Sequence, residues 1–323
     1  MKPNYKDQKI VVIGGGTGLS TMLKGLKEYT SHITAIVTVA DNGGSSGKLR
    51  EEMGMMPPGD IRNCLVALAN TEPIMEKLLQ HRFRDGSLQG QSFGNLLLAA
   101  LTEITGSFEE AVHVTSNVLA ITGKVLPVTL EDVHLHAVFE DGNLVVGETE
   151  IVEYGKLWHK AITHIELLPS EPELNQAVIC AIKEADKIIL GPGSLYTSII
   201  PNLLVKDICR HIAMAKGEKI YIANIMTQPG ETSHFTLEEH LAILEQYLGG
   251  KILQKVIINN ERVEDIYLKQ YAEDGATLLT VDESQDIWKK VERVEAPLIK
   301  INKQKKLIRH DPEKLAKCIF EGI

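Results

Sequence analysis

The sequence predicts a Rossmann-like α/β fold with a doubly wound, mostly parallel sheet, and three observations support this prediction. First, β-branched runs such as residues 10–13, Ile-Val-Val-Ile, suit strands that are covered on both faces. Second, such runs alternate with amphipathic segments of helical period, which is the order of βαβ units. Third, several runs lead directly into glycine-rich polar loops, which gather at the carboxyl ends of the strands in an open α/β sheet.

The first third of the chain is expected to hold one βαβ unit and a helical insertion. Strands are predicted at residues 10–13 and 33–40, with a helix at 19–29 between them. An irregular connector follows at residues 48–59, and Asp60 is predicted to be the N-cap of the next helix. Further helices are predicted at residues 72–82, 93–104 and 108–119, the last one opening with the capping pattern Ser107-x-x-Glu110. The helical insertion therefore covers about residues 60–120.

A second insertion, a β-hairpin with one further strand, is predicted at about residues 125–168. Residues 133–139 alternate between apolar and polar, a turn follows at 141–143, a strand returns over 144–152, and another lies near 162–167. The doubly wound order then resumes. Helices are expected at residues 174–185, 205–215, 237–248, 264–273 and 312–320, and strands at 187–190, 219–225, 255–259, 278–281 and 291–299. Residues 1–323 are interpreted as a single α/β domain with these two insertions.

Composition and charge limit the classes of function. A formal net charge of -9 argues against a general nucleic-acid binder, which needs clustered Lys and Arg. No stretch reaches the roughly 18 apolar residues of a membrane span, and the N-terminus has no apolar signal segment, so a cytoplasmic location is expected. The four cysteines form no metal or redox pair and are expected to be buried thiols: Cys64, Cys180, Cys209 and Cys318. The lysine-rich run 300–309 is interpreted as solvated surface, with contact to an anionic ligand as the alternative.

The glycine-rich loop after the first strand is the central candidate for a binding site. Gly14, Gly15, Gly16, Thr17 and Gly18 allow a sharp turn and close backbone approach, at the start of a helix whose free N–H groups favour phosphate. The spacing departs from the dinucleotide fingerprint, because position 19 is leucine instead of glycine, and the lysine of a P-loop is missing. Nucleotide or phosphate binding is predicted, and a tight turn without a ligand is the alternative.

Three more polar loops follow predicted parallel strands and are expected to line the same crevice. The candidate ligand-binding residues in and near them are Asp41, Asn42, Gly43, Gly44, Ser45, Arg62, Asn63, Asn95, Gly191, Gly193, Ser194, Tyr196, Asn224 and Thr227. The loop at Gly191 also offers successive backbone N–H groups and a helix start to an anion, as the first loop does. The two loops together therefore suit a diphosphate.

Several of these residues have more than one interpretation. Asp41 and Asp60 are candidate magnesium ligands, although Asp41 could instead contact a ribose hydroxyl and Asp60 could serve only as a helix cap. Arg62 could reach a phosphate or form a surface salt bridge. Asn95 could contact a ligand or cap its helix. Asn224 and Thr227, at a strand end, are expected to hold the nucleobase or sugar.

In their order along the chain, six motifs resemble those of the YvcK branch of the CofD-like superfamily, the gluconeogenesis factors. They are VVIGGGTGLSTMLKGLK, TVADNGGSSGKLREE, PPGDIRNCLVALA, FGNLLLAALTEI, GPGSLYTSIIPNL and NIMTQPGET. The resemblance covers nearly the whole chain. The resemblance implies a Rossmann-like fold and a cytoplasmic bacterial protein needed for cell shape and for growth on gluconeogenic carbon sources. It also implies binding of UDP-sugars such as UDP-N-acetylglucosamine and a link to peptidoglycan synthesis.

The sister CofD branch has similar GGGTG and aspartate loops, and it transfers a phospholactyl group from a guanosine dinucleotide-type donor to a deazaflavin with magnesium. This likeness would assign the magnesium role to Asp41, with Asp60 as a second candidate. The resemblance to the YvcK branch assigns no reaction, so it leaves open whether the chain catalyses one.

Two functions are therefore expected, and a third is disfavoured. The first is a nucleotide-sugar-binding regulator, because two phosphate cradles occur without a nucleophile elbow or a general-base motif. The second is a magnesium-dependent phospholactyl or phosphoryl transferase acting on a nucleotide-diphosphate donor. An NAD-linked oxidoreductase is disfavoured by the missing third glycine, although NAD could occupy the same crevice. A homo-oligomer and cell-wall synthesis partners are also expected.

Overall fold

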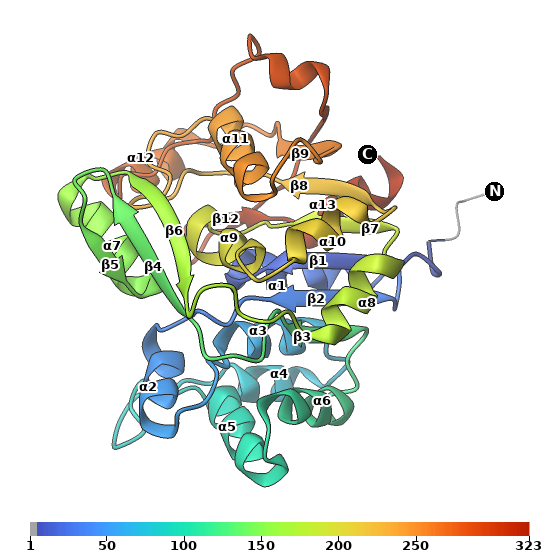
Figure 1. Ribbon diagram of the computed structural model, residues 1–323, viewed down its shortest axis with the longest axis vertical. Coiled ribbons are helices and arrows are strands. Elements are labelled where there is room, and N and C mark those ends of the chain that lie inside the picture. The colour runs from blue at the N-terminus through green and yellow to red at the C-terminus, as the bar shows by residue number, and fades with distance from the viewer. Residues whose placement is uncertain (1–4, 323) are drawn as a thin grey trace.

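A seven-stranded sheet forms the centre of the molecule. The computed structural model describes residues 5–322, and within them the strand order is β10-β9-β8-β7-β1-β2-β3 (Figure 1). Every neighbouring pair in this sheet is parallel. The strands are β1 (Ile10–Gly14), β2 (Ile33–Val37), β3 (Lys124–Pro127), β7 (Lys187–Leu190), β8 (Glu218–Ile222), β9 (Lys255–Asn259) and β10 (Glu292–Ala296). The predicted Rossmann-like, doubly wound fold is confirmed, and β3 belongs to the main sheet although it was predicted within the hairpin insertion.

Strand β1 lies in the interior of this sheet and is buried along its whole length. In the register of the sheet, Ile10 pairs with Ile33 of β2 on one side and with Lys187 of β7 on the other. Continuous β-branched residues suit this position because both faces of the strand are covered by helices. The chain runs outward from β1 to β2 and β3, then returns to β7 and continues outward to β10.

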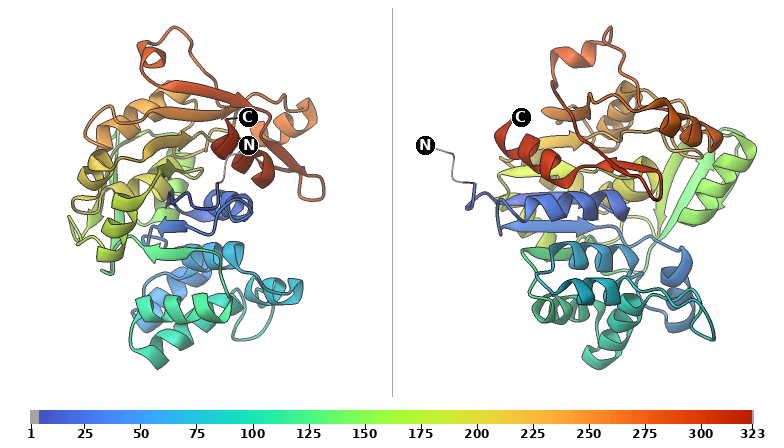
Figure 2. Two further views of the ribbon diagram at one scale, coloured as in Figure 1. Left: turned by 90° about the vertical axis from the view of Figure 1, so that its right-hand side faces the viewer. Right: turned by 180° about the vertical axis from the view of Figure 1, so that it is seen from behind.

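Helices cover both faces of the sheet (Figures 1 and 2). On one face α1 packs against α3 and α13, and on the other α8, α9 and α10 pack together. The bounds are α1 (Gly16–Leu26), α3 (Gly59–Leu68), α8 (Gln176–Glu184), α9 (Ile200–Leu203), α10 (Ile208–Met214), α11 (Leu237–Tyr247) and α13 (Pro312–Glu321). The predicted cap of the last helix is confirmed, because Asp311 accepts the backbone N–H groups of Glu313 and Lys314 at 3.0 and 3.1 Å.

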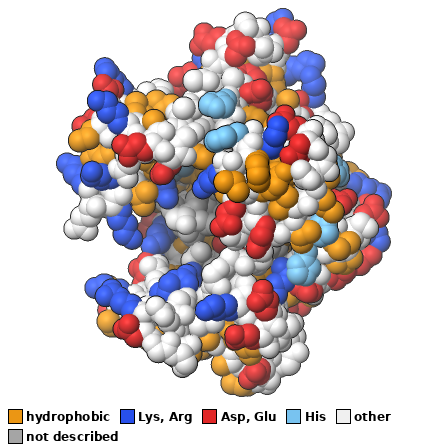
Figure 3. All heavy atoms as spheres, turned by 90° about the vertical axis from the view of Figure 1, so that its left-hand side faces the viewer, with side chains coloured by type: hydrophobic (Ala, Val, Ile, Leu, Met, Phe, Trp, Pro, Cys, Tyr) orange, Lys and Arg blue, Asp and Glu red, His pale blue; other side chains and the backbone are white. Residues whose placement is uncertain are grey.

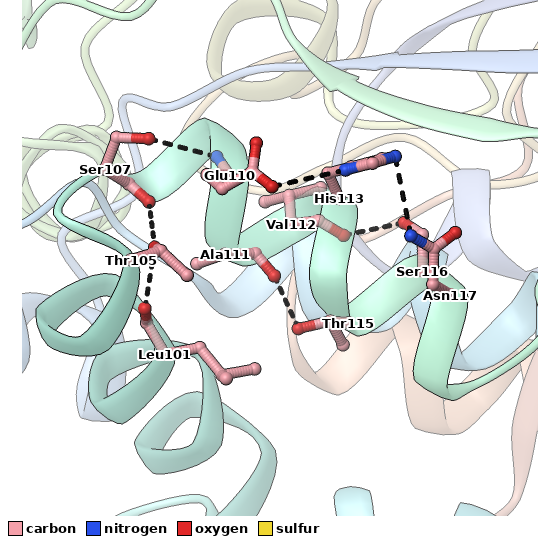
Figure 4. Close-up of polar contacts among 10 residues, drawn as sticks. All are labelled: Leu101, Thr105, Ser107, Glu110, Ala111, Val112, His113, Thr115, Ser116 and Asn117. Carbon is pink, nitrogen blue, oxygen red and sulfur yellow. Dashed lines mark hydrogen bonds and ion pairs between the residues drawn. The ribbon is translucent and has the colours of Figure 1, made fainter.

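A block of helices extends from the β3 edge of the sheet, at the bottom of Figure 1. It contains α2 (Gly44–Met53), α4 (Pro73–Leu79), α5 (Phe93–Thr105) and α6 (Phe108–Val118). The predicted N-cap of α6 is confirmed, because Ser107 Oγ accepts the N–H of Glu110 at 3.1 Å (Figure 4). Thr105 Oγ1 donates to the carbonyl oxygens of Leu101 and Ser107 and so ties the end of α5 to the start of α6.

The expected irregular connector at residues 48–59 is wrong in its first half, where α2 extends to Met53. Gly44 at φ +49° begins this helix, and Gly54 at φ +61° ends it in the left-handed conformation. The residues between them include good helix formers. The predicted cap at Asp60 is also wrong, since Pro58 holds the N-cap position of α3 and Asp60 is the second residue of the helix.

A separate antiparallel sheet, ordered β5-β4-β6, contains the predicted hairpin. Its strands are β4 (His134–Phe139), β5 (Leu144–Val146) and β6 (Ile162–Leu168). The predicted return strand over 144–152 is wrong after Val146, because α7 (Glu148–Trp158) begins there. Gly147 at φ +100° breaks the strand, and Ile151 and Gly155 then recur at helical spacing as buried positions.

The C-terminal region differs from the prediction in two strands. Residues 278–281 form only isolated bridges, from Leu278 to Met226 and from Thr280 to Thr236. The single strand expected at 291–299 is divided into β10 and β11 (Ile299–Asn302), because Pro297 lies between them and has no N–H to donate. Strand β11 pairs antiparallel with β12 (Leu307–His310), and α12 (Asp265–Glu273) packs beside this hairpin.

The core is aliphatic, as expected from the composition, and one continuous cluster reaches from Ile10 to Phe320. The expectation of four buried thiols is wrong for Cys180, which lies on the exposed side of α8, and for Cys209, which is half-buried. In residues 5–322, no helix has the length and apolar character that a membrane span requires.

Candidate functional site

The candidate site lies where the strand order reverses, between β1 and β7. From β1 the chain moves to one side of the sheet through β2, and from β7 it moves to the other side through β8. The helices that follow these strands therefore leave on opposite sides and open a crevice at the carboxyl ends, which is the usual ligand position in such folds. Figure 3 shows the face toward which the strand arrowheads of Figure 1 point, and this face is hollowed above the helical block.

The first loop connects β1 to α1 with almost no spare residues. Strand β1 ends at Gly14, Gly15 is extended, and α1 begins at Gly16, which has φ +68°. The N–H of Gly16 donates to Asp60 Oδ2 at 2.7 Å, and a Cβ atom added at Gly15 would lie 2.6 Å from the same oxygen. The glycines thus allow the start of α1 to lie against a carboxylate. The other N–H groups of its first turn have no acceptor within the helix.

The second loop, which follows β7, touches the first loop. A Cβ atom added at Gly18 would lie 2.5 Å from the Pro192 carbonyl oxygen, so only glycine permits this approach. Just after the adjoining strand β8, Asn224 Nδ2 donates to the Gly193 carbonyl oxygen at 2.8 Å. Asn224 therefore fixes the second loop, and the two loops and the end of β8 form one continuous wall.

The second loop leads into a π-helix, Leu195–Ile199, whose start is occupied by the carboxylate of Glu231. Glu231 accepts the N–H of Tyr196 at 3.2 Å, the Thr197 hydroxyl at 3.0 Å and Gln228 Nε2 at 2.9 Å. Burial raises the pKa of Glu231 to about 7, and the hydrogen bonds from Thr197 and Tyr196 act in the opposite direction. Glu231 lies in the motif NIMTQPGET but was not among the predicted site residues.

The two loops border a main cleft of about 650 Å³. The predicted residues that line it are Gly15, Gly16, Thr17, Gly18, Gly193, Ser194, Asn224 and Thr227. Gly14 and Gly191 are buried in the wall behind the cleft. Tyr196 is also buried and packs edge to face against Phe235, with ring centroids 6.4 Å apart.

Among the cleft residues that were not predicted as site residues are the ionisable side chains of Lys156, Tyr271, Asp274, Arg309 and His310. Lys156 belongs to α7, and Arg309 and His310 belong to β12, so they reach the cleft from segments far from the glycine loops in sequence. Arg309 is the last residue of the run 300–309, for which contact with an anionic ligand was the alternative interpretation. Burial lowers the pKa of His310 to about 4, and its Nε2 has no partner within residues 5–322.

The remaining predicted residues line a second, smaller cavity of about 230 Å³. They are Asp41, Gly43, Gly44, Ser45, Asp60, Arg62, Asn63 and Asn95. Asn42 instead bonds Glu150 Oε2 at 2.6 Å and the N–H of Thr149 at 3.1 Å, and so it holds the start of α7. The structure therefore divides the predicted site between two adjoining hollows, and the hydrogen bond from Gly16 to Asp60 connects their walls.

Asp60 and Asp41 lie close enough for their charges to interact. Burial, followed by the charge of Asp41, raises the pKa of Asp60 to about 6. Burial also raises the pKa of Glu148 well above its usual value, with Asp41, Asp60 and Glu231 adding to the effect. A divalent cation would relieve this repulsion, and two carboxylates beside phosphate oxygens are a usual magnesium site. Within residues 5–322, no group of three or more His, Cys, Asp or Glu side chains is arranged to hold a metal ion.

The interpretations left open for Arg62 and Asn95 can be compared with their contacts. Arg62 forms no salt bridge in the described part of the chain; its Nη1 donates to Ser92 Oγ at 2.5 Å and to Asn95 Oδ1 at 2.9 Å. Asn95 is buried, and the N-cap position of α5 is held by Ser92. Both side chains therefore belong to a polar network that lines the second cavity.

The chain is similar to a known protein family and to several of its members. A family model described as 2-phospho-L-lactate transferase CofD matches residues 10–299. A Bacillus subtilis protein named gluconeogenesis factor is 46% identical over 314 residues, which are 97% of this chain and 97% of that protein. A Clostridium acetobutylicum protein named for the same factor is 52% identical over 318 residues, 98% of this chain and 70% of that protein. A crystal structure of a Bacillus halodurans protein matches with a TM-score of 0.92 and 43% identity, covering 97% of this chain and 99% of that one.

The family model covers most of the chain, and the relatives align with it almost from end to end. The same loops also occupy the switch point that a nucleotide-binding α/β fold uses. The chain belongs to the CofD family, in the group of gluconeogenesis factors.

Proposed function

We propose that this protein binds a nucleotide diphosphate, in the first instance a UDP-sugar, in its main cleft, and that it acts as a regulatory factor that responds to this ligand. The observation that carries the proposal is the contact between the two glycine loops, where Gly18 meets Pro192 at the reversal of strand order. Two loops joined this closely present backbone N–H groups to one space, which suits adjacent phosphates. In the cell, we propose that this binding supports cell shape and growth on gluconeogenic carbon sources.

The charges and polar groups of the cleft suit such a ligand. Lys156 and Arg309 border the hollow and can neutralise a diphosphate. Asn224 uses its amide nitrogen to hold Gly193 and leaves its carbonyl oxygen for a ligand hydroxyl or N–H. Thr227 is buried and is held by the N–H of Thr277, which donates to Thr227 Oγ1 at 2.9 Å, so it supports the wall of the cleft. A volume of about 650 Å³ is within the range of small-molecule sites.

Calorimetry with UDP-N-acetylglucosamine tests the proposal, with UMP and NAD as comparison ligands. We expect saturable binding that Arg309→Gln weakens by roughly tenfold or more, because a charge-assisted hydrogen bond contributes about 1.5 to 3 kcal/mol. Arg262→Gln is the matched control, since Arg262 is exposed and lies outside the cleft. Failure of the UDP-sugar to saturate at millimolar concentration, or equal weakening by both variants, would contradict the proposal.

A magnesium-dependent transferase is the second candidate, favoured by the Asp41 and Asp60 carboxylates beside the start of α1. Magnesium, when bound, would neutralise charge at a phosphate. Asp41 and Asp60 would hold the ion, while the N–H groups at the start of α1 would orient the donor. Chromatography of a nucleotide-diphosphate donor incubated with magnesium and an acceptor alcohol should then show nucleotide release that Asp41→Asn abolishes. Release that is unchanged in Asp41→Asn would exclude this role for the pair.

A further inference from the structure

A third cavity, which we call the side cavity, extends the main cleft along the end of the sheet. It has a volume of about 130 Å³ and lies at the carboxyl ends of β8 and β9. Asn224 and Ile225 line both the side cavity and the main cleft, so the two are continuous. In the strand order, β8 and β9 follow directly after β7 and β1, so the side cavity lies two strand spacings of about 4.8 Å from the glycine loops.

The walls of the side cavity are mostly apolar and are fixed by backbone hydrogen bonds. The N–H of Leu279 donates to the Ile225 carbonyl oxygen at 3.1 Å, and that of Leu237 donates to the Thr280 carbonyl oxygen at 2.9 Å. These bonds hold the segment 278–281 against the end of β8 and the start of α11, although the segment forms only isolated bridges. The cavity is therefore preformed. Its apolar lining includes Ile225, Leu237, Ile258, Leu278, Leu279 and Val281.

Asparagine side chains supply the polar groups at the border of this cavity. Asn259 holds the turn after β9, because its Oδ1 accepts the N–H of Leu298 at 3.0 Å and its Nδ2 donates to the Glu261 carbonyl oxygen at 2.9 Å. The next residue, Asn260, lines the cavity with an exposed side chain, whose amide is available to a ligand. A primary amide carries a donor and an acceptor side by side, which matches the polar edge of a nucleobase.

The size of the side cavity limits the ring that it holds. An apolar protein cavity of about 150 Å³ binds benzene, so the volume of about 130 Å³ measured here suits one six-membered ring. A pyrimidine has one such ring, whereas a purine carries a second, fused ring. The main cleft, at about 650 Å³, sets no such limit, and it is bordered by the charged residues Lys156, Asp274 and Arg309. A flat and mostly apolar base therefore fits the side cavity better than the main cleft.

We propose that the side cavity receives the nucleobase of the bound nucleotide and that its size selects a pyrimidine over a purine. This inference rests on the proposed function, because a diphosphate held at the glycine loops directs the ribose past Asn224 toward β8 and β9. The base packs against the apolar walls, and its polar edge pairs with the amide of Asn260.

Photocrosslinking of the whole protein with 4-thiouridine 5′-diphosphate tests the position of the base. The sulfur replaces O4 at the edge of the ring that points away from the ribose. After digestion with trypsin, we expect the label on the peptide of residues 256–262, which contains Asn260 and other side-cavity residues but none that lines the main cleft. Excess UDP should suppress this label, and the same concentration of GDP should not. A digest in which neither 256–262 nor 278–281 carries the label would overturn the proposal.

Calorimetry with UDP, CDP and GDP measures the selectivity for the base. We expect UDP and CDP to bind tenfold or more tightly than GDP, since the second ring of guanine overfills the cavity. Equal affinities, or a preference for GDP, would contradict a cavity that selects by ring size.

Two substitutions change the volume of the side cavity in opposite directions. Val281→Phe fills it and should weaken UDP binding roughly tenfold or more. Val138→Phe is the matched control, because Val138 is half-buried like Val281 and lines neither the main cleft nor the side cavity. Leu279→Ala enlarges the cavity and should narrow the difference in affinity between UDP and GDP. Thermal unfolding checks that each variant is folded, and Leu279→Ala keeps the test decisive if Val281→Phe is not.

Failure of this inference differs from failure of the proposed function. If the wild type binds no UDP-sugar, both fail. If it binds one and Arg309→Gln weakens the binding, the proposed function stands. In that case equal effects of Val281→Phe and Val138→Phe, or a ratio of UDP to GDP affinity that Leu279→Ala leaves unchanged, would overturn the assignment of the base alone.

Discussion

Glu231 provides the sharpest test of how the second loop is built. Its carboxylate is buried at the start of the π-helix and bonds the N–H of Tyr196, the Thr197 hydroxyl and the Gln228 amide. The substitution Glu231→Gln keeps the size of the side chain and an acceptor oxygen, and it removes the ionisable group. We therefore expect the variant to fold and to differ from the wild type in how stability depends on pH.

The sign follows from the direction of the pKa shift. Burial raises the pKa of Glu231 from its usual value of 4.5 to about 7 in the folded protein. Between these two values the unfolded chain loses its proton while the folded protein keeps it, so the contribution of Glu231 to stability falls as pH rises. A shift of this size corresponds to about 3 kcal/mol, at about 1.4 kcal/mol per pH unit. Above pH 7 both states are ionised and the loss is complete.

Urea denaturation of the wild type and of Glu231→Gln, repeated from pH 5 to pH 8, measures this contribution. The free energy of unfolding of the wild type minus that of the variant should fall as pH rises to about 7 and then level off. Hydrogen bonds lost in the variant shift this difference by a constant amount and do not change its slope. A difference that is flat, or that rises with pH, would refute the assignment of Glu231 as a buried, protonated group.

Two further predictions concern the elements that support the site. Gly25→Ala should destabilise the protein by about 1 to 3 kcal/mol, because the new Cβ would lie 1.9 Å from the Pro312 carbonyl oxygen and would push α13 from α1. Denaturant unfolding measures this effect, with Gly250→Ala as the control, since a Cβ at Gly250 meets nothing within 4 Å. Equal effects of the two substitutions would contradict this packing. Asp311→Ala should cost about 1 kcal/mol, because the N-cap bonds of α13 are lost, and the same unfolding experiment would show an unchanged midpoint if the cap contributed nothing.

Much of the fold could be predicted because its signals are local. The β-branched residues of β1 lead directly into the glycines of the first loop, and both features lie within ten residues. The π-helix, by contrast, has no local pattern that distinguishes it from an ordinary helix. The helix α7 was missed because it begins only two residues after β5 ends, and the positive φ of Gly147 is the feature that separates the two.

The candidate site was less predictable, because its division depends on contacts between distant segments. Gly16 and Asp60 are 44 residues apart, and their hydrogen bond joins the walls of two hollows where the sequence suggested one crevice. Arg309 and Lys156 reach the main cleft from a hairpin and a helix whose positions no motif specified. Glu231 could not be identified as buried from sequence alone, since a glutamate in a polar loop is usually exposed.

A crystal structure of the protein soaked with UDP-N-acetylglucosamine tests the central claim most directly. The account predicts diphosphate density within hydrogen-bonding distance of the N–H groups at Thr17 and Gly18, with Arg309 on the open side of the ligand. Density for the diphosphate at any other place on the molecule, or a main cleft that stays free of ligand at saturating concentration, would contradict it.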